Sequence, residues 1–127
     1  MRRKFELEKD YLDNLVVVAV SGVLDSKTFD KLRDCLQELL DEEKTRIIVD
    51  MENLEYLSSA GIGVLFGIHK DIRRKKGDIK LCNLPVKVKN LFVMLGFSRI
   101  FKIYDNREEA VEGFTKDKDE EEKENDF

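Results

Sequence analysis

The sequence has few of the residues that catalytic and metal sites most often use. It holds one histidine and two cysteines among 127 residues, and Cys35 and Cys82 do not form a metal-binding or redox motif. Gly-x-Ser-x-Gly turns, phosphate-binding loops and calcium-loop spacings are also absent. His69 lies about three helical turns from the nearest candidate serine nucleophile, Ser59, which leaves that serine without an obvious base. The sequence therefore predicts a protein that is not an enzyme and that holds no metal or cofactor.

Long apolar runs and a basic excess are missing as well. No stretch approaches the roughly 18 apolar residues that span a bilayer, and the first eight residues lack the apolar core of a signal peptide. We therefore expect a cytoplasmic protein with no membrane partner, in which both cysteines are buried free thiols. The formal net charge of −4 comes from residues 116–127, which hold three lysines and seven acids. Residues 1–115 have no net charge, so they provide no basic surface for binding nucleic acid.

The residues that are present alternate between strand and helix patterns. Residues 15–20 and 45–51 are β-branched runs typical of strands buried on both faces, and 4–11 reads as an edge strand in a hairpin with 15–20. Two shorter strands are expected at 78–82 and 100–103. Four helices are expected between and after these strands, over residues 29–40, 59–76, 86–95 and 107–114. Asp25 or Ser26 is expected to cap the first of them, and Asn106 the last.

This alternation predicts the fold class. It favours a single α/β domain over residues 1–115, with a mostly parallel sheet, an antiparallel first hairpin strand and about four flanking helices. Residues 116–127 are too charged to bury a core, so we expect a disordered acidic tail. Ligands of such sheets bind beyond the carboxyl ends of the parallel strands, here residues 22–25, 50–59 and 83–84.

The helix expected over 59–76 begins with two serines and is rich in glycine. The hydroxyl of Ser58 or Ser59 can cap its first turn. Gly63 and Gly67 fall opposite the apolar face, although each glycine costs about 1 kcal/mol in a helix interior. Either a neighbouring helix packs closely against them, or the surface is kept bare for a partner.

Three blocks of this sequence resemble the STAS domain of bacterial anti-sigma factor antagonists. The longest is residues 47–65, IIVDMENLEYLSSAGIGVL, in which a hydrophobic strand precedes a Ser-Ala-Gly helix start. Residues 21–25, SGVLD, resemble the Gly-x-Leu-Asp turn of the family, and residues 95–110 resemble its last strand and helix. The blocks occur in the family's order over most of residues 1–114, and they imply an STAS fold.

The resemblance also implies a function. It places a phosphoacceptor at Ser59 and a nearby acid at Asp25, with Ser58 as the alternative acceptor because it stands where the family usually has aspartate. In such antagonists a partner anti-sigma factor with a kinase fold phosphorylates the serine, the unmodified form binds that partner and frees the sigma factor, and a serine phosphatase resets the switch.

The expected partner surface is the strand-end rim around Asp25, Ser58 and Ser59, extended by Ile62 and Phe66 on the flank of the central helix. A second hypothesis remains open. The chain can instead be an STAS module that is not phosphorylated and serves as a scaffold or accessory subunit of a stress-sensing or lipid-transport complex.

Overall fold

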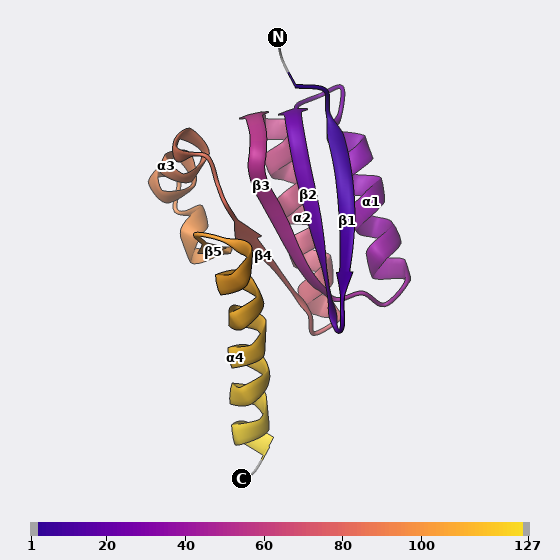
Figure 1. The fold of residues 1–127 in the computed structure, drawn as a ribbon, viewed down its shortest axis with the longest axis vertical. Coiled ribbons are helices and arrows are strands. Elements are labelled where there is room, and N and C mark those ends of the chain that lie inside the picture. Colours follow the sequence, from indigo (N-terminus) through magenta and orange to yellow (C-terminus); the bar gives the residue numbers. More distant parts are fainter. Residues whose placement is uncertain (1–2, 126–127) are drawn as a thin grey trace.

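The computed structural model describes residues 3–125 and consists, over that range, of a five-stranded sheet and four α-helices (Figure 1). The strands are β1 Glu6–Leu12, β2 Leu15–Leu24, β3 Arg46–Leu57, β4 Asp78–Cys82 and β5 Lys102–Tyr104. The helices are α1 Phe29–Asp41, α2 Ser59–Arg74, α3 Val86–Met94 and α4 Arg107–Asn125, with a short 3-10 helix, η1, at Phe97–Arg99.

The strand order β1-β2-β3-β4-β5 confirms the expected topology. β1 pairs with β2 antiparallel, and every later pair is parallel. Alternate residues of β2 explain why its sequence is apolar throughout. Val16 and Val18 join the main core under α1 and α2, whereas Leu15 and Val17 pack under α4 on the opposite face. α1 and α2 thus cover one face of the sheet, and α4 covers the part of the opposite face around Leu15 and Val17.

β2 and β3 are longer than the sequence indicated. Parallel pairing continues past the expected strand end at residue 20 to Leu24 and Leu57, and the register shifts on either side of Ser21 and Gly22 each place an extra residue on β3, as in a β-bulge. Gly22 has a φ of 88°, and a Cβ there would lie 2.8 Å from backbone atoms of Arg3, Lys4 and Phe5. Only glycine fits at this position, where the backbone of residues 3–5 crosses β2. As a consequence, Asp50 lies inside β3 and not at its carboxyl end.

α4 extends beyond the expected domain boundary at residue 115. Asp117, which the sequence assigned to a disordered tail, accepts hydrogen bonds from Lys80 Nζ at 2.8 Å and Lys102 Nζ at 3.2 Å. The Lys80 side chain is completely buried, so this part of the segment contacts the body of the domain. The side chains from residue 118 onward lie outside those that the structure describes, and the prediction of disorder for them is untested.

The starts of α1 and α2 differ from expectation, and in α2 the predicted serine cap is only partly right, because Ser58 is the N-cap residue but its side chain makes no capping hydrogen bond. Asn106 caps α4 as predicted, because its Oδ1 accepts from the Glu109 N–H at 2.9 Å. α1, however, begins after Thr28 and not after Asp25 or Ser26. Asp25 instead closes the preceding turn, where its Oδ1 accepts from the Lys27 N–H at 2.9 Å.

Candidate functional site

The ends of β2 and β3 meet at the start of α2. The Ser58 N–H donates to the Leu24 carbonyl at 2.9 Å, which ties the two strand exits together. A Cβ on Gly61 would lie 2.7 Å from the Leu57 side chain and 2.8 Å from that of Leu24, so glycine lets α2 begin directly against both strands. The structure thus brings Asp25 and Ser59 to the same edge, each one residue beyond this junction.

The two serines at this junction differ in accessibility. Ser58 is the N-cap residue, with extended backbone, and its Oγ is buried with no hydrogen-bond partner among the described residues. Ser59, the first helical residue, is exposed. A hydroxyl without access to solvent cannot reach an incoming phosphoryl donor, so the geometry favours Ser59 over Ser58 as a modification site.

The start of α2 favours an anion beside Ser59. The first turn of α2 contains no acidic residue, and the cap side chain makes no hydrogen bond to the free backbone N–H groups. Those N–H groups carry the positive end of the helix dipole. A phosphate attached at the first helical residue therefore enters a favourable local field.

Asp25 lies in a tightly bonded turn between β2 and α1. The Thr28 hydroxyl accepts from the Asp25 N–H at 3.0 Å and donates to the Val23 carbonyl at 2.8 Å. The Asp25 carboxylate is partly exposed while it accepts from the Lys27 N–H. The turn therefore holds Asp25 in a fixed position at the rim.

Ile62 and Phe66, the apolar part of the expected partner surface, lie on the flank of α2, and their contact with a partner stays a prediction. Both are half-buried against the main core. The Phe66 ring packs edge-on against Phe97 of η1, with centroids 4.8 Å apart, and against Phe101 at 5.2 Å. The structure thus makes Phe66 mainly a packing residue, a role that the sequence did not indicate because Phe97 lay in an expected loop.

Gly63 and Gly67 are exposed on α2, and a Cβ on either would meet no atom within 4 Å. In the part of the chain that the structure describes, α1 lies across a groove from these glycines and does not pack closely against them, so the first of the two hypotheses is wrong. They line a groove between α1 and α2, with a cavity volume of about 400 Å³. The other lining residues are Phe29, Arg33, Gln37, Ala60, Val64, Ile68 and Asp71.

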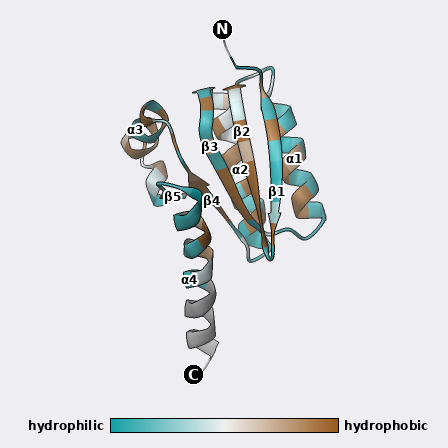
Figure 2. Cartoon of the chain, in the orientation of Figure 1, coloured by the Kyte–Doolittle hydropathy of each residue, from teal (hydrophilic) through white to brown (hydrophobic). Residues whose placement is uncertain are grey.

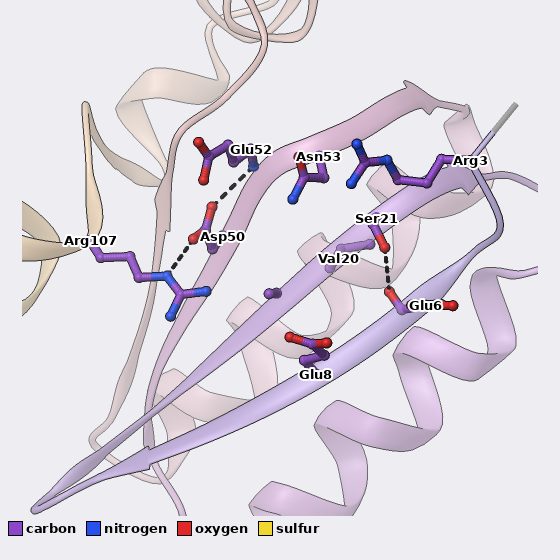
Figure 3. Close-up of a pocket in the computed structure, with 10 residues that line it drawn as sticks. Arg3, Glu6, Glu8, Val20, Ser21, Asp50, Glu52, Asn53 and Arg107 are labelled. Atoms are coloured by element: carbon purple, nitrogen blue, oxygen red, sulfur yellow. Dashed lines mark hydrogen bonds and ion pairs between the residues drawn. The ribbon is translucent and has the colours of Figure 1, made fainter.

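The opposite sheet face carries a polar pocket of about 170 Å³ (Figure 3). Asp50, buried in β3, accepts from Arg107 Nε of α4, from Asn83 Nδ2 at 3.1 Å and from the Glu52 N–H at 3.0 Å. This hydrogen bond to Asp50 raises the pKa of Arg107 above its usual value. Since its carboxylate is engaged by α4, by the residue after β4 and by the backbone of β3, Asp50 stabilises the fold and is not part of the rim.

Other chemistry-bearing groups lie apart from the rim. Burial raises the pKa of the Cys82 thiol to about 12, so this thiol is unreactive at neutral pH. Among the residues that the structure describes, no group of three or more His, Cys, Asp or Glu side chains is placed to hold a metal ion. The described helices are each too short or too polar to cross a membrane.

Comparison with known proteins identifies the class. The STAS domain family model matches residues 6–110, and the chain belongs to this family. The Anti-sigma F factor antagonist of Paenibacillus polymyxa is 31% identical over 107 residues, which cover 84% of this chain and 92% of that protein. The Anti-sigma-B factor antagonist of Bacillus subtilis is 28% identical over 100 residues, 79% of this chain and 91% of that protein.

Solved structures share the fold. SpoIIAA, an anti-sigma factor antagonist in its unphosphorylated form, superposes with a TM-score of 0.73 at 24% identity, covering 88% of this chain and 96% of that one. The phosphorylated form of SpoIIAA, a Bacillus cell fate determinant, gives a TM-score of 0.68 at 23% identity over 87% and 99% of the two chains.

Proposed function

We propose that this chain is an anti-sigma factor antagonist switched by phosphorylation of Ser59. In its unphosphorylated form it binds an anti-sigma factor of the kinase class and so releases a sigma factor. The same partner then phosphorylates Ser59 with ATP, and a serine phosphatase restores the binding form. The observation that carries the proposal is the exposed Ser59 hydroxyl at an acid-free helix start, beside a Ser58 hydroxyl that is buried.

The comparisons support this proposal. The curated relatives bear the name of anti-sigma factor antagonists, and SpoIIAA has been solved in both unphosphorylated and phosphorylated forms. In this chain, Ser59-Ala60-Gly61, which resembles the acceptor motif of the family, lies at the start of α2.

Phosphate on Ser59 is expected to change binding more than folding. It adds about −1.5 to −2 charges, and the helix dipole favours such a charge by about 0.3 to 1 kcal/mol. The exposed position requires no rearrangement of the core. Burying an unmatched dianion against a partner surface, in contrast, costs several kcal/mol. Phosphorylation therefore releases the partner and leaves the domain folded.

Ser58 is the weaker candidate for the acceptor. Its Oγ lies beneath the start of α2, where the Ser58 N–H is held by the Leu24 carbonyl. Adding a phosphate to Ser58 requires this junction between β2, β3 and α2 to open. Phosphorylation of Ser58 would thus cost stability, which phosphorylation of Ser59 does not.

The test is a pull-down from the native cell with the tagged chain, with and without ATP, followed by phosphopeptide mapping. We expect a kinase-class anti-sigma factor to be captured, and ATP to place phosphate on Ser59 in the wild type and in Ser58→Ala, but not in Ser59→Ala. Phosphate retained in Ser59→Ala would contradict the site. Capture of a transporter or a multisubunit complex, with no modification by ATP, would favour the scaffold hypothesis instead.

A further inference from the structure

The exposed apolar residues of the described chain concentrate on α3 and the segment that follows it. Of the eight large apolar side chains that are exposed, five lie within residues 86–100. Met94 is 77% exposed and Val86 75%, whereas α3 buries only Val88 and Phe92. We name this region the α3 surface, defined by Val86, Val93, Met94, Leu95 and Ile100. Figure 2 shows the apolar character of α3, at the margin of the molecule.

The chain segment that carries the α3 surface also has an excess of basic residues. Residues 83–104 contain four lysines or arginines and no acidic residue. Lys89 pairs with Asp105 at 3.7 Å and Lys102 with Asp117 at 3.2 Å. Lys87 and Arg99 are exposed and form no ion pair among the described residues. Two uncompensated cations therefore flank the apolar side chains.

Aromatic packing fixes the α3 surface against α2. Phe97 of η1 contacts Phe66 of α2 and also Phe92 of α3, and the centroids of the Phe92 and Phe97 rings are 5.5 Å apart. Phe92 is completely buried. The surface is thus preformed, so a partner need not pay the entropy of ordering it. It lies at the same end of the molecule as the start of α2 (Figure 1).

We infer that the α3 surface is a second contact for the partner that engages Ser59, and that the partner's matching surface is apolar and acidic. The inference rests on the proposed function. Carboxylates on the partner would pair with Lys87 and Arg99 around a central apolar contact. A second copy of this chain fits less well, because α3 against α3 would bring like charges together. Phe66, half-buried against Phe97, connects this surface to the rim.

The experiment measures the affinity of the captured anti-sigma factor for four variants by calorimetry. Met94→Glu is expected to weaken binding about tenfold or more, because it puts a negative charge in place of the most exposed apolar side chain, opposite an acidic partner surface. Lys87→Glu should weaken binding less and reduce its dependence on salt. Leu12→Glu, at the β1–β2 hairpin, and Lys31→Glu, on α1, are the matched controls and should bind as the wild type does.

The outcomes separate the two proposals. If the wild type binds the anti-sigma factor and Met94→Glu binds equally well, the α3 surface is not a contact and the proposed function stands. If the wild type does not bind a kinase-class anti-sigma factor, the proposed function itself fails. Flotation with vesicles of phosphatidylglycerol and phosphatidylcholine tests whether the α3 surface binds a membrane and not a protein. Loss of vesicle binding in Met94→Glu, with unchanged affinity for the anti-sigma factor, would overturn the inference in favour of a lipid surface. Thermal melting checks that each variant is folded.

Discussion

The ion pair between Lys80 and Asp117 is expected to fasten the C-terminal half of α4 to the sheet. Lys80 Nζ is completely buried and lies 2.8 Å from Asp117 and 3.2 Å from Asp78. It also lies 4.6 Å from the centroid of the Phe114 ring. Replacing Asp117 with asparagine removes the closest compensating charge from a buried ammonium group.

The magnitude follows from this environment. Breaking a fully buried ion pair costs about 3 to 5 kcal/mol. Asp117 is 33% exposed and Asp78 stays in place, so we expect Asp117→Asn to lower the free energy of unfolding by about 1 to 2 kcal/mol. For a domain of this size, that loss corresponds to about 4 to 8 °C in melting temperature.

Thermal and urea unfolding of Asp117→Asn, with Glu112→Gln as an exposed control on the same helix, measures the effect. The Lys80→Met background isolates the pair, because without the buried charge the Asp117 substitution should cost little. Equal stability of Asp117→Asn and Glu112→Gln would refute the reasoning, as would an unchanged cost of Asp117→Asn in Lys80→Met.

The same contact predicts a pH dependence. Burial disfavours the Asp117 carboxylate, but the hydrogen bonds and charges of Lys80 and Lys102 outweigh it and hold the pKa of Asp117 below its usual value. Its contribution is therefore present above the unfolded-state pKa and is lost as the pH falls through the lower folded-state pKa. Asp117→Asn should flatten the acid limb of the stability curve.

Three further predictions follow from the described contacts. Arg107→Met leaves the buried Asp50 carboxylate without its cation and should lower the free energy of unfolding by about 2 to 3 kcal/mol, measured in urea. Gly61→Ala should destabilise by about 1 to 3 kcal/mol because its Cβ overlaps Leu57 and Leu24, whereas Gly63→Ala, with open space around it, should stabilise by about 0.5 to 1 kcal/mol. Deleting residues 118–127 should leave the melting temperature unchanged within error, because those residues carry little apolar surface.

Each of these three predictions has a result that would contradict it. A neutral Arg107→Met would show that Asn83 and the Glu52 N–H suffice for Asp50. Equal effects of the two glycine substitutions would show that α2 shifts freely on the strands. A drop in melting temperature on deletion of 118–127 would place contacts beyond Asp117.

Local patterns predicted most of the fold. The β-branched runs and the three- and four-residue spacing of leucines in α1 depend only on neighbours in sequence, and both gave the correct elements. The continuation of β2 past Gly22 depends on the backbone of residues 3–5 crossing it, a contact that the sequence does not display. Asp117 likewise sits in a charged segment with no local sign of a buried lysine 37 residues away.

Some features of the candidate site could also be predicted from local sequence, and others depend on contacts between distant segments. The position of Ser59 at a helix start follows from the serine–glycine pattern, and the family resemblance selected it as the acceptor. The burial of the Ser58 hydroxyl depends on the Leu24–Ser58 junction, and the covering of Phe66 depends on η1. The exposed α3 surface was also missed, because Val93, Met94 and Leu95 have the composition of a core.

The most direct test of the proposed phosphorylation switch is the affinity of the purified chain for the proposed kinase-class anti-sigma factor before and after stoichiometric phosphorylation. We expect tight binding of the unmodified chain, a loss of about a hundredfold on phosphorylation, and full binding by Ser59→Ala under the same conditions. Equal affinity of the phosphorylated and unphosphorylated chains would contradict the switch.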